Sequence, residues 1–401
     1  MLFDELSPSD SIFRSRLCPA AFAACLMLLG IFPVTGQAQD ATSNPWSQPE
    51  LPAAYEASLL QPFWVGSRMS NEPMFFLQEA NEPLATARLL FVPTKILSFS
   101  SVNGATTFVE GKDYTWKRGS NVLTLTSGSR IPFKTTAEMH PAIGAPHTLG
   151  KTKDGAHSLY FIPNGPTFQN MQPLITYDHS AKWTGLLPAS GKTELVRTMA
   201  KLKAKQPVNI VILGDSISTG ASASSTFNEF PYQPSYPDIV ADGLRLRYGA
   251  PISLVNLSEG GQDSKWGVTQ AAKVVDAKPD LVLIAFGMND CSRLVSGESY
   301  GESVNKIVAT VRASLPETDF IIVSTTLGNP DWDQSVPELY SKYLDVLTAA
   351  KQPGITVADM TTVWQEMLKI KKFSDITANG INHPNDFGQR IYAHVILQLM
   401  Q

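Results

Sequence analysis

The order in which apolar and amphipathic segments follow one another constrains the fold of residues 207–401 most strongly. Short apolar runs rich in β-branched residues alternate there with longer stretches of helical periodicity. This alternation is typical of a parallel sheet with helices on both faces, because each parallel strand needs a crossover before the next one. We expect strands at 208–213, 252–257, 280–286, 319–324 and 355–359, and helices at 235–248, 264–276, 300–314, 335–350, 360–371 and 386–400.

Residues 59–182 show a different pattern. Short runs of β-branched and aromatic residues are separated there by turn signals such as Asn103-Gly104. Regularly spaced short strands of this kind predict an all-β sandwich or jelly-roll-like domain. Residues 183–206 then form a connection with a helical piece at 192–205. The expected strands are 89–92, 96–99, 106–109, 114–116, 122–125, 159–162 and 174–177.

The N-terminus has the features of a secretory signal peptide, which we place at residues 1–38. Arg14 and Arg16 precede an apolar segment at 17–34, and the small residues Gly36 and Ala38 offer the −3 and −1 positions of a cleavage site. A retained membrane anchor is the alternative. Polar, Pro-bearing residues 39–58 are expected to form a linker. The pattern predicts a periplasmic or secreted protein with no membrane attachment after cleavage.

Composition narrows the class of protein. A chain of 401 residues with 43% hydrophobic residues can build two large cores. The net charge of −4 provides no basic footprint, so nucleic-acid binding is not expected. His140, His147 and His157 lack the spacing of metal ligands, so no metal is predicted. Of the three cysteines only Cys291 lies beyond the signal segment, so no internal disulfide is expected.

Four polar loops follow or flank the strands of the second domain. Residues 214–216 (Gly-Asp-Ser) follow the first strand, 259–263 the second and 287–290 (Gly-Met-Asn-Asp) the third. The fourth, 379–386, stands near the C-terminus. Ligands of open α/β sheets bind at the carboxyl ends of the strands. We therefore expect these four loops to gather at one edge of the sheet.

The residue types in these loops fit acyl transfer. A serine hydroxyl is a weak nucleophile that needs a base, usually histidine, and Ser216 and His383 can fill these roles. The tetrahedral intermediate needs preset hydrogen-bond donors. The backbone N–H groups of Ser216 and Gly261 and the side-chain amide of Asn289 can supply them.

Taken together, the four segments resemble the signature blocks of the SGNH (GDSL-like) hydrolase family. The resemblance covers about residues 207–400, with the blocks in the family's order and spacing. It implies a flavodoxin-like sheet and serine esterase activity without a cofactor. It also implies Ser216 as nucleophile, His383 as base, and Ser216, Gly261 and Asn289 as the oxyanion hole.

One position departs from the family pattern. The family usually carries an Asp three residues before the histidine, and Gly380 stands there in this chain. Asn379 could orient His383 through its amide oxygen, or Asp375 could reach round the loop. In a third reading a backbone carbonyl serves and the enzyme works as a Ser-His dyad. Asp386 is expected to begin the last helix as a cap or first-turn acid.

The expected function is a secreted serine ester hydrolase that removes acetyl groups from a polysaccharide or oligosaccharide. A lipase-like or small-ester hydrolase and a non-catalytic glycan-binding protein are the alternatives. The expected partner is an ester substrate, chiefly an acetylated glycan. Four aromatic residues could line the acyl or sugar site or could pack in the core: Tyr232, Tyr236, Trp266 and Trp332.

Overall fold

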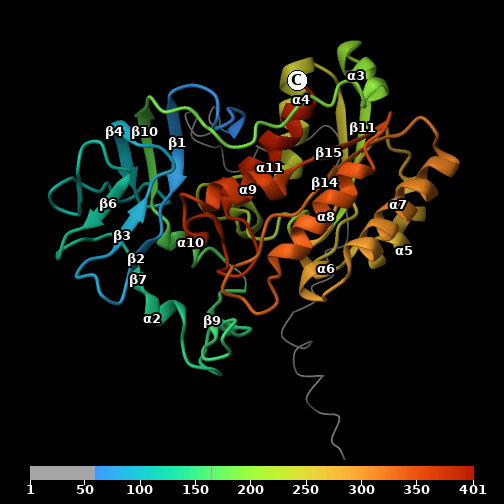
Figure 1. The fold of residues 1–401 in the computed structure, drawn as a ribbon. Helices are drawn as coiled ribbons and strands as arrows, with labels where there is room; N and C mark the ends of the chain where they lie inside the picture. Colours follow the sequence, from blue (N-terminus) through green and yellow to red (C-terminus); the bar gives the residue numbers. More distant parts are fainter. Residues whose placement is uncertain (1–58, 164) are drawn as a thin grey trace, which may run out of the picture. The chain divides into compact units, whose positions relative to one another are not determined.

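A computed structural model of the chain describes residues 59–163 and 165–401 (Figure 1). The predicted signal peptide and linker, residues 1–58, lie outside the described residues. The described chain comprises a β-rich part, a connection and an α/β part. Within it, no helix is long and apolar enough to cross a bilayer.

The α/β part is built on a five-stranded sheet in which every neighbouring pair is parallel. The strand order β12-β11-β13-β14-β15 is the flavodoxin-like one, with the order reversing at β11. All five strands lie where the sequence predicts them, since buried parallel strands appear as short continuous apolar runs. The strands are β11 (Val208–Gly214), β12 (Ile252–Asn256), β13 (Leu281–Ala285), β14 (Asp319–Val323) and β15 (Ile355–Ala358).

Helices cover both faces of this sheet (Figure 1). Helix α4 packs against α11 on one side, while α5 contacts α7 and α7 contacts α8 on the other. The sequence predicts all six of the longer helices after residue 230 to within a few residues. The helices are α3 (Val196–Lys203), α4 (Tyr236–Tyr248), α5 (Ser264–Asp276), α6 (Met288–Ser292), α7 (Gly297–Ser314), α8 (Pro337–Ala349), α9 (Met360–Leu368), α10 (Phe373–Ile376) and α11 (Asp386–Leu399).

Side-chain caps explain where several of these helices begin. The Asp263 carboxylate accepts a hydrogen bond from the third N–H of α5, and Ser296 does the same for α7. Asp359 caps α9, and Asn385 caps α11. Asp386 is therefore the first-turn acid of α11, one of the two roles expected from the sequence.

The β-rich part contains two main sheets. One has the order β1-β10-β4, and the other has the order β5-β6-β3-β2-β7. Their aromatic side chains meet, because Phe99 of β4 contacts Phe76 of β2 and Tyr114 of β5. This sandwich of sheets agrees with the predicted all-β domain. The elements are β1 (Arg68–Pro73), β2 (Phe76–Gln78), β3 (Thr86–Arg88), β4 (Pro93–Ser100), β5 (Tyr114–Trp116), β6 (Val122–Leu125), β7 (Phe133–Thr135), α2 (Thr136–Met139), β8 (Thr148–Leu149), β9 (Leu159–Tyr160), η1 (Gln169–Met171) and β10 (Leu174–His179).

Two of the predicted strands in this part are wrong. Residues 89–92 connect β3 to β4 instead of forming a strand. These apolar residues are largely buried. Instead of bonding to the backbone of a neighbouring strand, the Leu90 N–H donates to the Glu72 carboxylate and the Phe91 N–H donates to the Tyr177 hydroxyl. Residues 106–109 likewise form only an isolated bridge to β4.

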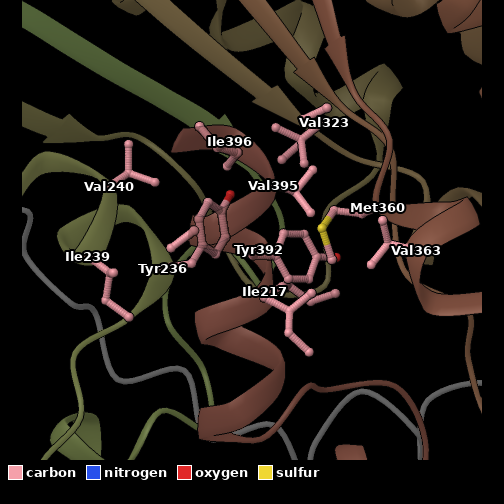
Figure 2. Packing of buried hydrophobic residues seen from close by; sticks show 14 of the residues in the cluster. Ile217, Tyr236, Ile239, Val240, Val323, Met360, Val363, Tyr392, Val395 and Ile396 are labelled. Atoms are coloured by element: carbon pink, nitrogen blue, oxygen red, sulfur yellow. The ribbon is translucent and has the colours of Figure 1, made fainter. Parts of the chain in front are cut away.

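A continuous cluster of buried apolar side chains runs through both parts. Figure 2 shows a portion of this cluster, in which the rings of Tyr236 and Tyr392 stack with centroids 5.0 Å apart. The Tyr236 hydroxyl lies 2.6 Å from the Ser218 hydroxyl. Ile217 packs into the same cluster. These tightly packed side chains therefore hold the turn at residues 214–218 in place.

Candidate active site

Ser216 stands in the turn that follows the central strand β11. Gly214 ends that strand, and a side chain there would collide with the carbonyl of Ala285 on β13. Asp215 is buried, and its Oδ1 accepts a hydrogen bond of 2.9 Å from the Ile217 N–H. Burial raises the pKa of the Asp215 carboxyl to about 7. These contacts fix the turn and leave Ser216 half-buried at the carboxyl end of the sheet.

The loop before α11 brings His383 to this serine. His383 Nε2 lies 2.9 Å from Ser216 Oγ. The Thr377 hydroxyl donates to the His383 carbonyl at 2.9 Å and closes the loop. Desolvation lowers the pKa of the imidazole to about 4. The histidine is therefore neutral at neutral pH, as a base must be.

The partner of the second imidazole nitrogen is a residue that the sequence did not suggest. His383 Nδ1 lies 3.2 Å from the hydroxyl of Ser222, in the turn after Ser216. Asn379 was one of the candidates for this position, but its Oδ1 accepts from the backbone N–H groups of Ile381, Asn382 and His383. Asn379 thus shapes the loop and does not contact the ring.

At the position of the family's usual Asp, a side chain would fit only if neighbouring atoms shifted. Gly380 has φ +85°, and a Cβ there would lie well inside van der Waals contact with the carbonyl oxygen of Tyr160. Tyr160 belongs to β9 in the β-rich part. The Asn329 side-chain amide donates to the Gly380 carbonyl at 2.7 Å. The Tyr160 carbonyl therefore stands close to where the Cβ of an acidic residue would lie.

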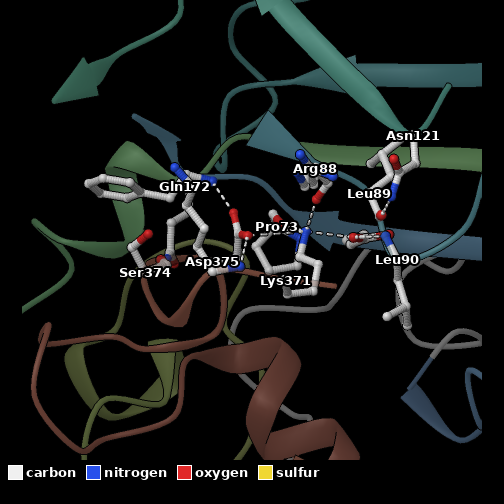
Figure 3. Close-up of polar contacts among 12 residues, drawn as sticks. Pro73, Arg88, Leu89, Leu90, Asn121, Gln172, Lys371, Ser374 and Asp375 are labelled. Carbon is white, nitrogen blue, oxygen red and sulfur yellow. Dashed lines mark hydrogen bonds and ion pairs between the residues drawn. The ribbon is translucent and has the colours of Figure 1, made fainter. Parts of the chain in front are cut away.

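Asp375 is not an orienter of the imidazole either. It is buried, and its Oδ1 accepts from the Phe75 N–H at 2.7 Å while Oδ2 accepts from the Lys372 N–H at 3.0 Å. Its Oδ2 also lies 3.7 Å from the Lys371 ammonium (Figure 3). This carboxylate joins the β-rich part to the α/β part.

Lys371 is the centre of that buried contact. Its ammonium donates to Glu72 Oε1 at 2.6 Å and to the Arg88 carbonyl at 2.5 Å, and the side chains of Lys371 and Glu72 are both completely buried. The second Glu72 oxygen accepts from the Tyr177 hydroxyl at 2.6 Å. Because the charges are paired and hydrogen-bonded, burial is tolerated.

The three expected oxyanion donors converge on the same edge. Within the described chain, the N–H groups of Ser216 and Gly261 donate to no protein acceptor. The Asn289 amide donates to the Gln262 carbonyl at 2.8 Å, which uses one of its two hydrogens. A Cβ on Gly260 would lie 3.8 Å from Ser216 Cβ, so this loop adjoins the nucleophile. The arrangement leaves donors available for a developing oxyanion.

Further contacts hold the oxyanion loop in place. Arg293 donates to the Gly261 carbonyl at 2.7 Å and pairs with the Asp263 carboxylate at 2.6 Å. Gly261 has φ +76°, a conformation that glycine adopts without strain. The Asn256 amide donates to the Ser218 carbonyl at 2.7 Å and ties this loop to the serine turn. The loops are thus fixed relative to one another before any substrate arrives.

Other residues singled out in the sequence have packing roles. Cys291 is buried, and burial raises the pKa of its thiol. Among the described residues, no group of three or more His, Cys, Asp or Glu side chains is placed to hold a metal ion. The four aromatic candidates pack against other side chains: Tyr236 on Tyr392, Trp266 on Phe286, Tyr232 on Phe230, and Trp332 with Leu159 and Ile381.

Comparison with known proteins supports the family suggested by the four loops. Residues 212–391 match the model of the GDSL-like Lipase/Acylhydrolase family. This match spans 180 of the chain's 401 residues. The GDSL-like segment contains all the residues expected at the site, Ser216, Gly261, Asn289 and His383 among them.

Individual proteins show more distant similarity. An arylesterase from Vibrio mimicus is 28% identical over 106 residues, which cover 26% of this chain and 49% of the relative. The chain thus spans about half the length of that curated relative. A solved two-domain esterase active on acetylated mannans aligns with TM-score 0.43 and 24% identity over 54% of each chain. An acetyl xylan esterase variant from Geobacillus stearothermophilus aligns with TM-score 0.40 and 20% identity, over 48% of this chain and 94% of the other.

Proposed function

We propose that the protein is a serine ester hydrolase that works through an acyl-enzyme. The observation that carries the proposal is the 2.9 Å contact between Ser216 Oγ and His383 Nε2. It lies at the sheet edge where, among the described residues, the Ser216 and Gly261 N–H groups have no protein acceptor. Nucleophile, base and oxyanion donors are the parts that acyl transfer needs.

The geometry suggests the order of events. Ser216 Oγ attacks the ester carbonyl carbon while its proton passes to His383 Nε2, and the carbonyl oxygen becomes an oxyanion facing the three donors. The intermediate collapses, the C–O bond to the alcohol breaks, and the imidazolium gives its proton to the leaving alkoxide. Water then attacks the acyl-enzyme with the same base, releasing the acid and restoring Ser216.

For the natural substrate we propose an acetylated polysaccharide or oligosaccharide met outside the cytoplasm. Three features support this. The N-terminal segment resembles an export signal. The β-rich part adjoins the active-site loop through Tyr160. The net charge of −4 and the pI near 5.9 do not favour binding to polyanions such as nucleic acids. A lipase-like or small-ester hydrolase is the second candidate within the same chemistry.

Release of p-nitrophenol and of acetate tests the proposal. The wild type and Ser216→Ala are compared on p-nitrophenyl acetate, on longer-chain p-nitrophenyl esters and on acetylated polysaccharides. We expect turnover by the wild type only, with preference for acetyl over long acyl chains. Equal rates for the two proteins on every ester would refute catalysis. Retained glycan binding in that case would indicate a non-catalytic glycan-binding protein.

A further inference from the structure

A glutamine of the β-rich part reaches into the catalytic loops. Gln169 lies in η1, between β9 and β10, and is almost completely buried. Its Nε2 donates to the Ser222 carbonyl at 2.6 Å, and its Oε1 accepts from the Asp386 N–H at 3.2 Å. The two ends of one amide therefore hold the turn after Ser216 and the start of α11, three residues after His383.

Ser222 needs this kind of support. It has φ +70°, a left-handed conformation that is unfavourable for a residue with a side chain. Its hydroxyl meets His383 Nδ1 at 3.2 Å, and a hydroxyl holds an imidazole less strongly than a carboxylate does. The Ser224 N–H also donates to the Asp386 carboxylate at 2.9 Å, a second tie between the same two segments. The hydroxyl thus stays on the ring only while its backbone is held.

The proton on the imidazole makes this placement matter for catalysis. For Nε2 to accept the Ser216 proton, the other ring nitrogen must carry the hydrogen of the neutral imidazole. Nδ1 then donates to the Ser222 oxygen. If Ser222 moves away, nothing favours this tautomer, and a part of the enzyme has Nε2 protonated and unable to act as base.

We infer that Gln169 is a positioning residue of the active site: by holding the Ser222 backbone, it keeps the Ser222 hydroxyl on His383 Nδ1 and Nε2 free as the base. The β-rich part thereby supplies the support that a carboxylate gives in other members of the family. The inference rests on the proposed esterase function.

A double-mutant cycle tests the inference. Gln169→Ala and Ser222→Ala should each lower kcat about 10-fold, the loss expected from one hydrogen bond, with KM changed less than about 2-fold. Since Gln169 acts through Ser222, the double variant should be no more than about 2-fold slower than either single one. Multiplied losses, near 100-fold, or an unchanged kcat in Gln169→Ala would overturn the inference.

Gln172 provides a matched control. It is equally buried in the same segment, but its amide donates to the carbonyls of Ser374 and Thr377. The loss from Gln172→Ala should therefore multiply with that from Ser222→Ala. If Gln169→Ala does not fold, Gln169→Met keeps a side chain of similar length and removes the hydrogen bonds to Ser222 and Asp386, and it should show the same non-additivity.

Nitrogen NMR of ¹⁵N-histidine-labelled protein separates this inference from the proposed function. In the full chain, His383 should be mostly Nδ1-protonated at neutral pH, and Gln169→Ala should lower that fraction. An unchanged tautomer in the variant would refute the positioning role, whatever the enzymatic activity. A changed tautomer in a protein that hydrolyses no ester would uphold the role of Gln169 and refute the esterase.

Discussion

Gly380→Ala tests the most unusual feature of the active-site loop. The substitution adds a single carbon at φ +85°, where a Cβ costs about 1–2 kcal/mol. That carbon also runs into the Tyr160 carbonyl, and displacing a packed neighbour costs about 1–3 kcal/mol more. We therefore expect the free energy of unfolding to fall by about 2–5 kcal/mol. Because the same loop carries His383, kcat should fall as well.

The matched control is Gly104→Ala. Gly104 has φ +69°, but a Cβ there would meet nothing within 4 Å, so only the conformational cost applies. Urea unfolding followed by circular dichroism measures both variants, and Gly380→Ala should be less stable by about 1–3 kcal/mol. Gly380→Asp, which restores the family's acid, should be no better. Equal stability of the two alanine variants, or faster turnover in Gly380→Asp, would refute the reasoning.

Three further predictions concern the same molecule. Asn289→Ala should lower kcat about 10²–10³-fold with little change in KM, because it removes a donor to the oxyanion. Steady-state kinetics would contradict this role of Asn289 if kcat changed little or if only KM changed. Because burial lowers the pKa of His383 to about 4, the base stays unprotonated down to mildly acidic pH, so kcat/KM should fall only as the pH drops through about 4. An acid limb near the ordinary value of about 6.5 would contradict this. Lys371→Met leaves Glu72 buried without its cation, so the free energy of unfolding, measured in urea or by heating, should fall by about 3–5 kcal/mol. A fall below about 1 kcal/mol would contradict the complete burial of this ion pair.

The sequence predicts the α/β part well because its elements are locally encoded. Each strand is a continuous apolar run, and several helices begin at a residue that caps them, as Asp263 and Asn385 do. The β-rich part is harder to predict, because burial there does not imply a strand. The run at 89–92 is apolar, yet its backbone bonds to side chains of distant residues. The predicted domain boundaries at 182 and 207 stay predictions.

At the site, the sequence identifies the residues that chemistry requires by type. Ser216 and His383 are brought together as expected, with Gly261 and Asn289 in the neighbouring loops. Ser222 gives no such signal, since it is one of several serines in a small-residue stretch. Its role depends on a left-handed backbone and on a glutamine about 50 residues earlier, neither of which a local pattern encodes.

The buried contact around Lys371 has a consequence for how such a chain can be recombined. The segment that matches the family model could be taken for an independently folding domain. It contains Lys371 and Asp375, however, and their partners Glu72 and Phe75 lie in the preceding β-rich part. Without the preceding part, this segment would have the Lys371 ammonium exposed to water or buried without its carboxylate partner. A cut at the boundary that sequence comparison draws would therefore separate Lys371 from Glu72 and Asp375 from Phe75.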